Sequence, residues 1–182
     1  MGTSISEGKK VIVSWIADLN LQYNRILDLG AGSGTYSRIL RKKKKRDIAN
    51  AYWIAVEAYA PYINDFDLKS LYDEVVNEDI RTLNYDSFTP IDITFAGDVL
   101  EHITKEEAID VINKALLISD YVIISIPIIK YPQEAINGNP FEIHIKDDWT
   151  HNEVMESFAH IKQSWTGEIV GCYLLSTKKE EV

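Results

Sequence analysis

The residues best suited to chemistry lie in a glycine-rich stretch near the start of the chain. Residues 25–40 read RILDLGAGSGTYSRIL: an apolar run with Asp28 near its end, then a cluster of glycines, then a helical pattern. Glycine lets the backbone turn tightly, and the amides at the start of the following helix can then approach a ligand closely. The stretch therefore predicts a cofactor cradle made of Gly30, Ala31, Gly32, Ser33 and Gly34.

Carboxylates follow three later apolar runs and suggest what the cradle holds. Glu57 ends the run at 51–58 and could accept two hydrogen bonds from a ribose diol. Asp79, or its neighbour Glu78 in the same role, lies beside Ile80, which suits the amino group and the ring face of an adenine. Asp98 directly follows the run at 91–97. Together these positions predict a ligand that contains a nucleoside.

An alternation of strands and helices is expected to position these residues. The runs 25–29, 51–58, 73–77, 91–97 and 121–126 are typical of buried parallel strands, and 161–166 with 168–177 indicate a hairpin around Gly167. Helical patterns lie between them, with an N-terminal helix in residues 1–22 that Ser4 or Ser6 could cap, and capping-box spacings at residues 104/107 and 150/153. We expect an α/β fold with a doubly wound, mostly parallel sheet and a C-terminal antiparallel hairpin. In such a sheet the carboxyl ends of the strands form one ligand-binding edge.

Composition limits the class of protein and its partners. A chain of 182 residues with 46% hydrophobic content suits one domain spanning 1–182. A net charge of −9 argues against nucleic-acid and anionic-membrane partners, and the basic run 41–46 is interpreted as a solvated helix end. The single cysteine and the lack of a signal-like or membrane-spanning apolar segment favour a cytoplasmic protein. We expect a monomer or a homodimer.

Four segments carry a resemblance to a known family. The segments ILDLGAGSGTYS, WIAVEAY, NEDIRTL and FAGDVLEHI resemble, in order and spacing, the cofactor motifs of the class I S-adenosylmethionine-dependent methyltransferases, over roughly residues 25–126. The resemblance implies a seven-stranded Rossmann-like sheet and a methyl donor held by the glycine turn. It further implies that Asp28 organises the turn or reaches the donor's amino group, that Glu57 binds the ribose, that Asp79 and Ile80 bind the adenine, and that Asp98 lines the methionine end.

Two histidines are candidate catalytic residues. His102 follows the fourth strand, and a histidine with a pKa near neutrality can take a proton from an acceptor. His144 lies in residues 127–149, a candidate substrate loop in which Phe141 and Trp149 would either wall an acceptor pocket or anchor the loop to the core. No histidine and carboxylate have the sequence spacing of metal ligands, so we expect no metal.

The sequence leaves the methyl acceptor open: it favours a small molecule, leaves a protein as the alternative, and argues against a nucleic acid. Two other functions compete. A nicotinamide-dependent oxidoreductase would use a related turn, but Thr35 stands where its fingerprint has a third glycine. A catalytically silent subunit that binds the cofactor would keep the same residues.

Overall fold

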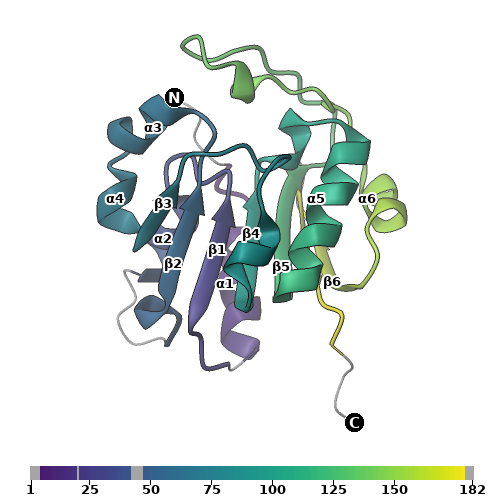
Figure 1. Cartoon of the computed structure of the whole chain (residues 1–182). Coiled ribbons are helices and arrows are strands. Elements are labelled where there is room, and N and C mark those ends of the chain that lie inside the picture. Colours follow the sequence, from purple (N-terminus) through teal and green to yellow (C-terminus); the bar gives the residue numbers. More distant parts are fainter. Residues whose placement is uncertain (1–4, 20, 42–46, 179–182) are drawn as a thin grey trace.

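The computed structural model describes residues 5–19, 21–41 and 47–178, in which a seven-stranded sheet forms the centre (Figure 1). The sheet order is β3-β2-β1-β4-β5-β7-β6, in which only β7 runs antiparallel to its neighbours β5 and β6 within this part of the chain. The expected doubly wound sheet with a C-terminal hairpin is confirmed. The strands are β1 (Arg25–Leu29), β2 (Tyr52–Val56), β3 (Glu74–Val76), β4 (Ile91–Gly97), β5 (Ser119–Pro127), β6 (Ile161–Thr166) and β7 (Val170–Leu175).

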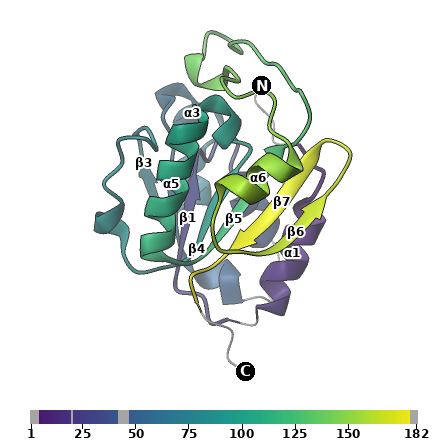
Figure 2. The same ribbon diagram turned by 90° about the vertical axis from the view of Figure 1, so that its right-hand side faces the viewer.

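Helices cover both faces of the sheet (Figures 1 and 2). One face packs against α5 and α6, and the other against α1 and α2, so that two apolar layers enclose the strands. No helix in the described ranges has the length and apolarity that a membrane crossing requires. The helices are α1 (Lys9–Asp18), α2 (Thr35–Arg41), α3 (Ala60–Asp65), α4 (Leu68–Leu71), α5 (Lys105–Ile118) and α6 (His151–Ser157).

The register of the parallel strands brings their carboxyl ends together. Leu29, the last residue of β1, pairs with Val56 on one side and Ala96 on the other. Gly97 at the end of β4 pairs with Ser125 of β5. The turns that leave β1, β2 and β4 therefore open on the same edge, as expected from the sequence.

The N-terminal helix begins differently from the prediction. Helix α1 spans Lys9–Asp18 rather than most of residues 1–22, and Gly8, not Ser6, stands at its N-cap with a φ of 77°. A Cβ on Gly8 would lie 2.3 Å from Cys172 Sγ, so only glycine fits there. The alternative cap Ser4 lies outside the described residues, as does the basic run after Arg41 up to Arg46.

A carboxylate fixes the segment before α1 to the C-terminal hairpin. Glu7 accepts hydrogen bonds from the backbone N–H groups of Glu168, Ile169 and Val170, at 3.0, 2.9 and 2.7 Å. These three bonds lower the pKa of the Glu7 carboxyl below its usual value. The chain before α1 is therefore held across one end of the sheet, close to the edge where the parallel strands end.

The two predicted capping boxes have different outcomes. At α5 the box is complete, since Thr104 accepts from the Glu107 N–H and the Glu107 carboxylate accepts from the Thr104 N–H. At α6 only half of it forms, because Thr150 accepts from the Glu153 N–H while the Glu153 carboxylate pairs with lysines. The Glu153 carboxylate forms ion pairs with Lys105 and Lys146 in place of the bond to the Thr150 N–H that would complete the box.

Candidate active site

The glycine-rich turn between β1 and α2 has the backbone shape that requires glycine. Gly30, Gly32 and Gly34 have φ values of 64°, 50° and 72°, in the left-handed region. A Cβ on Gly30 would lie 2.3 Å from Val99 Cγ2, whereas one on Gly32 would meet nothing closer than a backbone oxygen at 3.8 Å. The space in front of Gly32 is therefore open to a ligand.

A cavity of about 390 Å³ lies between this turn and the loop 127–149. Its volume is within the range of small-molecule sites, about 300–1,000 Å³. The loop passes over the carboxyl ends of the strands at the top of Figure 1. All but two of the residues predicted for the site line the cavity, namely Gly30, Ala31, Gly32, Ser33, Glu57, Asp79, Ile80, Asp98, His102 and His144.

Glu57 links the end of β2 to the glycine turn. Its Oε2 accepts a hydrogen bond of 2.8 Å from the Gly32 N–H, and its Oε1 accepts one of 2.8 Å from the Tyr59 N–H. The side chain is buried, and burial raises the pKa of its carboxyl although both amides oppose the shift. Each oxygen keeps a second lone pair, so the carboxylate can still accept hydrogen bonds from a ligand in the cavity.

Asp79 is held by an arginine that the sequence analysis did not identify. Arg81 donates to both carboxylate oxygens of Asp79, with Nη2 at 2.6 Å from Oδ2 and Nε at 3.0 Å from each oxygen. Burial raises the pKa of Asp79, but the bonds and charge of Arg81 outweigh burial and lower it. Asp79 lines the cavity and Glu78 does not, which favours Asp79 among the two alternatives.

Asp28 and Gly34 are the two predicted residues that do not line the cavity. The Asp28 carboxylate is 2% exposed and accepts a hydrogen bond of 2.5 Å from the Tyr72 hydroxyl. Burial raises its pKa to about 7, against the opposing effects of Tyr72 and Lys9. Gly34 packs against the end of α4 and against Tyr72, since a Cβ on Gly34 would lie 2.8 Å from the Leu71 side chain and 3.3 Å from the Tyr72 ring. Asp28 is thus bonded to Tyr72, and neither Asp28 nor Gly34 lines the cavity.

Asp98 is paired with a lysine from the N-terminal helix. Lys9 is 5% exposed, and its ammonium donates to Asp98 at 3.1 Å, to the Tyr36 hydroxyl at 3.1 Å and to Ser125 at 2.9 Å. Burial lowers the pKa of Lys9, but Tyr36 and Asp98 together raise it above its usual value. Asp98 itself has a φ of 53°, a conformation that is uncommon outside glycine and tends to occur at functional sites.

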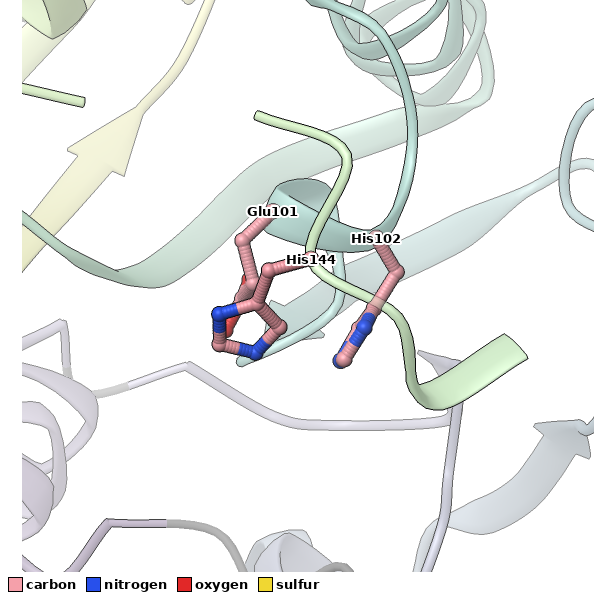
Figure 3. A group of neighbouring side chains, drawn as sticks. All are labelled: Glu101, His102 and His144. Carbon is pink, nitrogen blue, oxygen red and sulfur yellow. The ribbon is translucent and has the colours of Figure 1, made fainter. Parts of the chain in front are cut away.

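Backbone hydrogen bonds dock the loop 127–149 onto the turn after β4. The Glu101 carbonyl accepts from the N–H groups of Ile145 and Lys146, at 2.9 and 3.0 Å. This contact places His144 against His102, with ring centroids 4.8 Å apart. Figure 3 shows Glu101, His102 and His144 leaving two neighbouring segments and pointing to the same side.

Hydrogen bonds define the state of the two histidines. His102 Nδ1 lies 3.2 Å from the Ile143 carbonyl, and His144 Nδ1 is bonded to the Tyr131 carbonyl. Burial lowers the pKa of both imidazoles, and for His102 the neighbouring His144 adds to the effect. Both rings are therefore neutral at neutral pH, with Nδ1 protonated and Nε2 carrying the lone pair.

The two aromatic residues of the loop have separate roles. Trp149 is 1% exposed and stacks on Phe158 in the core, so it anchors the loop and does not wall the cavity. Phe141 is 39% exposed and lines the cavity. Trp149 thus anchors the loop as one reading expected, whereas a role of Phe141 as the wall of an acceptor pocket stays a prediction.

Comparison with solved structures identifies the class of fold. No protein-family profile and no curated protein matches the sequence. Similar solved structures include the N-terminal domain of EvdMO1 with S-adenosylhomocysteine bound (TM-score 0.67, 12% identity, covering 96% of this chain and 83% of that one). They also include magnesium protoporphyrin IX methyltransferase of Synechocystis PCC 6803 with S-adenosylmethionine bound (0.63, 18%, 93% and 77%) and the small RNA methyltransferase HEN1 (0.70, 14%, 100% and 27%).

The fold is therefore that of the class I S-adenosylmethionine-dependent methyltransferases, as the four sequence segments implied. At these identities the likeness concerns the fold, and function rests on the residues of this chain's own site.

Proposed function

We propose that the protein is a methyltransferase that uses S-adenosylmethionine and transfers its methyl group to a small-molecule acceptor. The observation that carries the proposal is the hydrogen bond from the Gly32 amide to the Glu57 carboxylate. It joins the open glycine turn to a carboxylate that can accept hydrogen bonds from ribose hydroxyls, and both residues line one cavity. Similar structures that contain S-adenosylmethionine or its product support the choice of cofactor.

The residues of the cavity fit this cofactor. The side of Gly32 that a Cβ would occupy faces open space, which allows backbone to approach a ligand. Glu57 would hold the ribose hydroxyls, Asp79 the adenine amino group, and Ile80 the adenine ring face. Asp98 would line the methionine end.

The chemistry asks the protein mainly to position two reactants. S-adenosylmethionine supplies an electrophilic methyl group on a positively charged sulfur. Because that charge disappears as the methyl leaves, carboxylates near it stabilise the ground state at least as much as the transition state, and we assign them to binding. The loop 127–149 would exclude water and hold the acceptor near the methyl group.

A proton must also leave an acceptor hydroxyl or ammonium group. His102 and His144 are suited to take it, because their lowered pKa values keep both rings neutral at neutral pH with Nε2 able to accept. His144 lies in the loop 127–149, His102 lies in the turn after β4 that this loop contacts, and both line the cavity. This arrangement supports their assignment as the predicted acceptor-side residues.

The lining also favours a small acceptor over a nucleic acid. Five carboxylate residues line the cavity, namely Glu57, Asp79, Asp98, Glu101 and Glu142. Arg81 also lines it, but its guanidinium is paired with Asp79 and Glu107. An acidic cavity in a chain of net charge −9 repels a phosphate backbone.

Calorimetric titration with S-adenosylmethionine, S-adenosylhomocysteine and NADH tests the cofactor. We expect both adenosyl ligands to bind with 1:1 stoichiometry and NADH to bind more weakly. Tighter binding of NADH would support the oxidoreductase alternative, and no binding of either adenosyl ligand would refute the proposal.

Substitution of His102 separates an enzyme from a silent binding subunit. His102→Ala should leave the affinity for S-adenosylhomocysteine nearly unchanged and lower turnover in a methyl-transfer screen of hydroxyl and amine compounds. An equal loss of binding and turnover would assign His102 to the cofactor site or to the fold. A wild-type protein that binds the cofactor but methylates none of the compounds would favour the silent subunit.

A further inference from the structure

We propose that Glu101, His102 and His144 bind a divalent transition-metal ion on the loop side of the cavity. One possible ligand atom from each residue lies within 4.8 Å of the other two (Figure 3). Metal–nitrogen and metal–oxygen bonds of about 2.0–2.2 Å place neighbouring ligand atoms about 3–4 Å apart. Small rotations of the side chains therefore suffice to close the group around an ion. The expectation of no metal came from sequence spacing, which does not show that His144 folds back against His102.

The hydrogen bonds of the two histidines prepare them as ligands. A carbonyl can only accept, so the Ile143 and Tyr131 carbonyls require a proton on Nδ1 of His102 and His144. The Nε2 atom of each ring then carries a lone pair. Metal-bound histidines are commonly oriented in this way, by a backbone carbonyl that accepts from the other ring nitrogen.

Glu101 supplies the second, independent observation. Glu101 is 2% exposed, and its Oε2 atom is buried without a hydrogen-bond partner among the described residues. A buried carboxylate with an unpartnered oxygen is costly unless a cation compensates it. A metal ion bound to Oε2 would compensate the charge of the carboxylate and give this oxygen a coordination partner.

Lys9, a cation whose charge acts on Glu101, is already engaged by other groups. Lys9 directs its three donors to Asp98, Tyr36 and Ser125. Glu142 lies in the loop, and its negative charge acts on Glu101 and on both histidines. The surroundings of the cluster therefore favour an additional positive charge.

The ligand set indicates the class of metal. Two imidazoles and one carboxylate suit Mn²⁺, Fe²⁺, Co²⁺ or Zn²⁺ better than Mg²⁺ or Ca²⁺, which prefer oxygen ligands. Three protein ligands also leave coordination positions open, as in catalytic rather than structural sites. All three residues line the cavity, so an open position can face an acceptor.

The role of the ion rests on the proposed function. An acceptor hydroxyl bound to the metal would have a lowered pKa and release its proton to solvent water. The oxygen electron pair then forms the bond to the methyl carbon, and the carbon–sulfur bond breaks with its electrons remaining on sulfur. The products are a methyl ether and an uncharged thioether, so charge and atoms balance. In this role the histidines position the acceptor through the ion rather than removing its proton themselves.

Metal titration of the whole protein tests the proposal. Chelator-treated protein without a polyhistidine tag is titrated with MnCl₂, CoCl₂, ZnCl₂ and MgCl₂ by calorimetry, and Co²⁺ binding is followed by visible absorption. We expect one Mn²⁺, Co²⁺ or Zn²⁺ per chain with weaker Mg²⁺ binding. Glu101→Gln and His144→Asn should each weaken binding by more than about 100-fold, since loss of a group that merely orients a ligand costs about 10–100-fold.

A histidine outside the cluster provides the matched control. His160 has a φ of 66°, which asparagine tolerates, so His160→Asn should fold and bind the metal as the wild type does. The proposal is overturned if no ion binds stoichiometrically, or if the cluster variants keep wild-type affinity while circular dichroism shows them folded. If one variant fails to fold, His102→Gln replaces it. Titration of the same samples with S-adenosylhomocysteine separates failure of the metal site from failure of the proposed function.

Discussion

Replacement of Glu57 by glutamine tests the ribose site most directly. Both carboxylate oxygens of Glu57 accept a backbone N–H at 2.8 Å, from Gly32 and from Tyr59. A glutamine side chain has one oxygen and one NH₂ group, so its NH₂ must face one of these two donors. The variant therefore loses one backbone bond and, at the same atom, the ability to accept from a ligand hydroxyl.

The expected loss of affinity follows from the number of bonds removed. A hydrogen bond to a charged group contributes about 1.5–3 kcal/mol. Loss of one such bond to the ribose weakens binding by about 10- to 150-fold, at about 1.4 kcal/mol for each factor of ten. Calorimetric titration of Glu57→Gln with S-adenosylhomocysteine should show a change in Kd of this size.

A deoxy ligand distinguishes direct binding from a distorted turn. The analogue of S-adenosylhomocysteine without the ribose 2′-hydroxyl should bind the wild type more weakly than the parent, and this difference should shrink in Glu57→Gln. An unchanged difference in the variant would refute contact between Glu57 and the ribose. Glu78→Gln is the matched control, because Glu78 follows the neighbouring strand β3 but does not line the cavity, and its affinity should equal that of the wild type.

Three further substitutions test the support of the site. Burial raises the pKa of Asp28 to about 7, so the folded protein binds a proton on this carboxyl more tightly than the unfolded chain does. The protonated carboxyl therefore stabilises the fold at low pH, and this stabilisation is lost as the pH rises from about 4 through 7. Asp28→Asn should therefore gain Tm relative to the wild type between pH 4.5 and 7.5 and keep its affinity for S-adenosylhomocysteine; a constant Tm difference would contradict the shifted pKa. Lys9→Met leaves a buried carboxylate without its cation and should lower the free energy of unfolding in urea by about 3–5 kcal/mol, whereas a loss below about 1 kcal/mol would show that the pair contributes little. Gly30→Ala brings a Cβ to within 2.3 Å of Val99 and should destabilise the fold by more than Gly138→Ala, which has a similar positive φ but nothing within 4 Å; equal losses would mean that backbone strain alone is responsible.

The sheet and the strand-end residues could be predicted because local patterns specify them. Short apolar runs bounded by glycine or polar residues gave the strands, and the rule that parallel strands end at one edge brought Gly32, Glu57, Asp79 and Asp98 to one cavity. Asp28 was harder to place, because side chains of a strand alternate between faces and Asp28 is still inside β1. Its neighbours Leu27 and Leu29 pack on the face of α5, so Asp28 points to the opposite face, toward Tyr72.

Residues that act through distant partners gave no signal in the sequence. Lys9 is separated by 89 positions from Asp98, and a lysine in an amphipathic helix normally lies in solvent. Arg81 could have been recognised as a partner of Asp79 two positions earlier, although spacing of two in a loop is weak evidence. His144 meets His102 where the loop backbone bonds to the Glu101 carbonyl and to the His102 ring, contacts that no sequence pattern records.

The way in which the carboxylates are compensated separates the two halves of the cavity. On the cofactor side, Glu57 is compensated by two backbone amides, Asp79 by Arg81, and Asp98 by Lys9. On the loop side, Glu101 keeps a buried oxygen without a partner in the described chain, next to two neutral imidazoles. Removal of positive charge from sulfur during transfer makes further negative charge beside the cofactor unhelpful, whereas an acceptor oxygen needs positive charge as it loses its proton. A cation at Glu101 would meet that need without weakening the compensated cofactor side, so the same acidic cavity can hold a cationic donor and activate an oxygen acceptor.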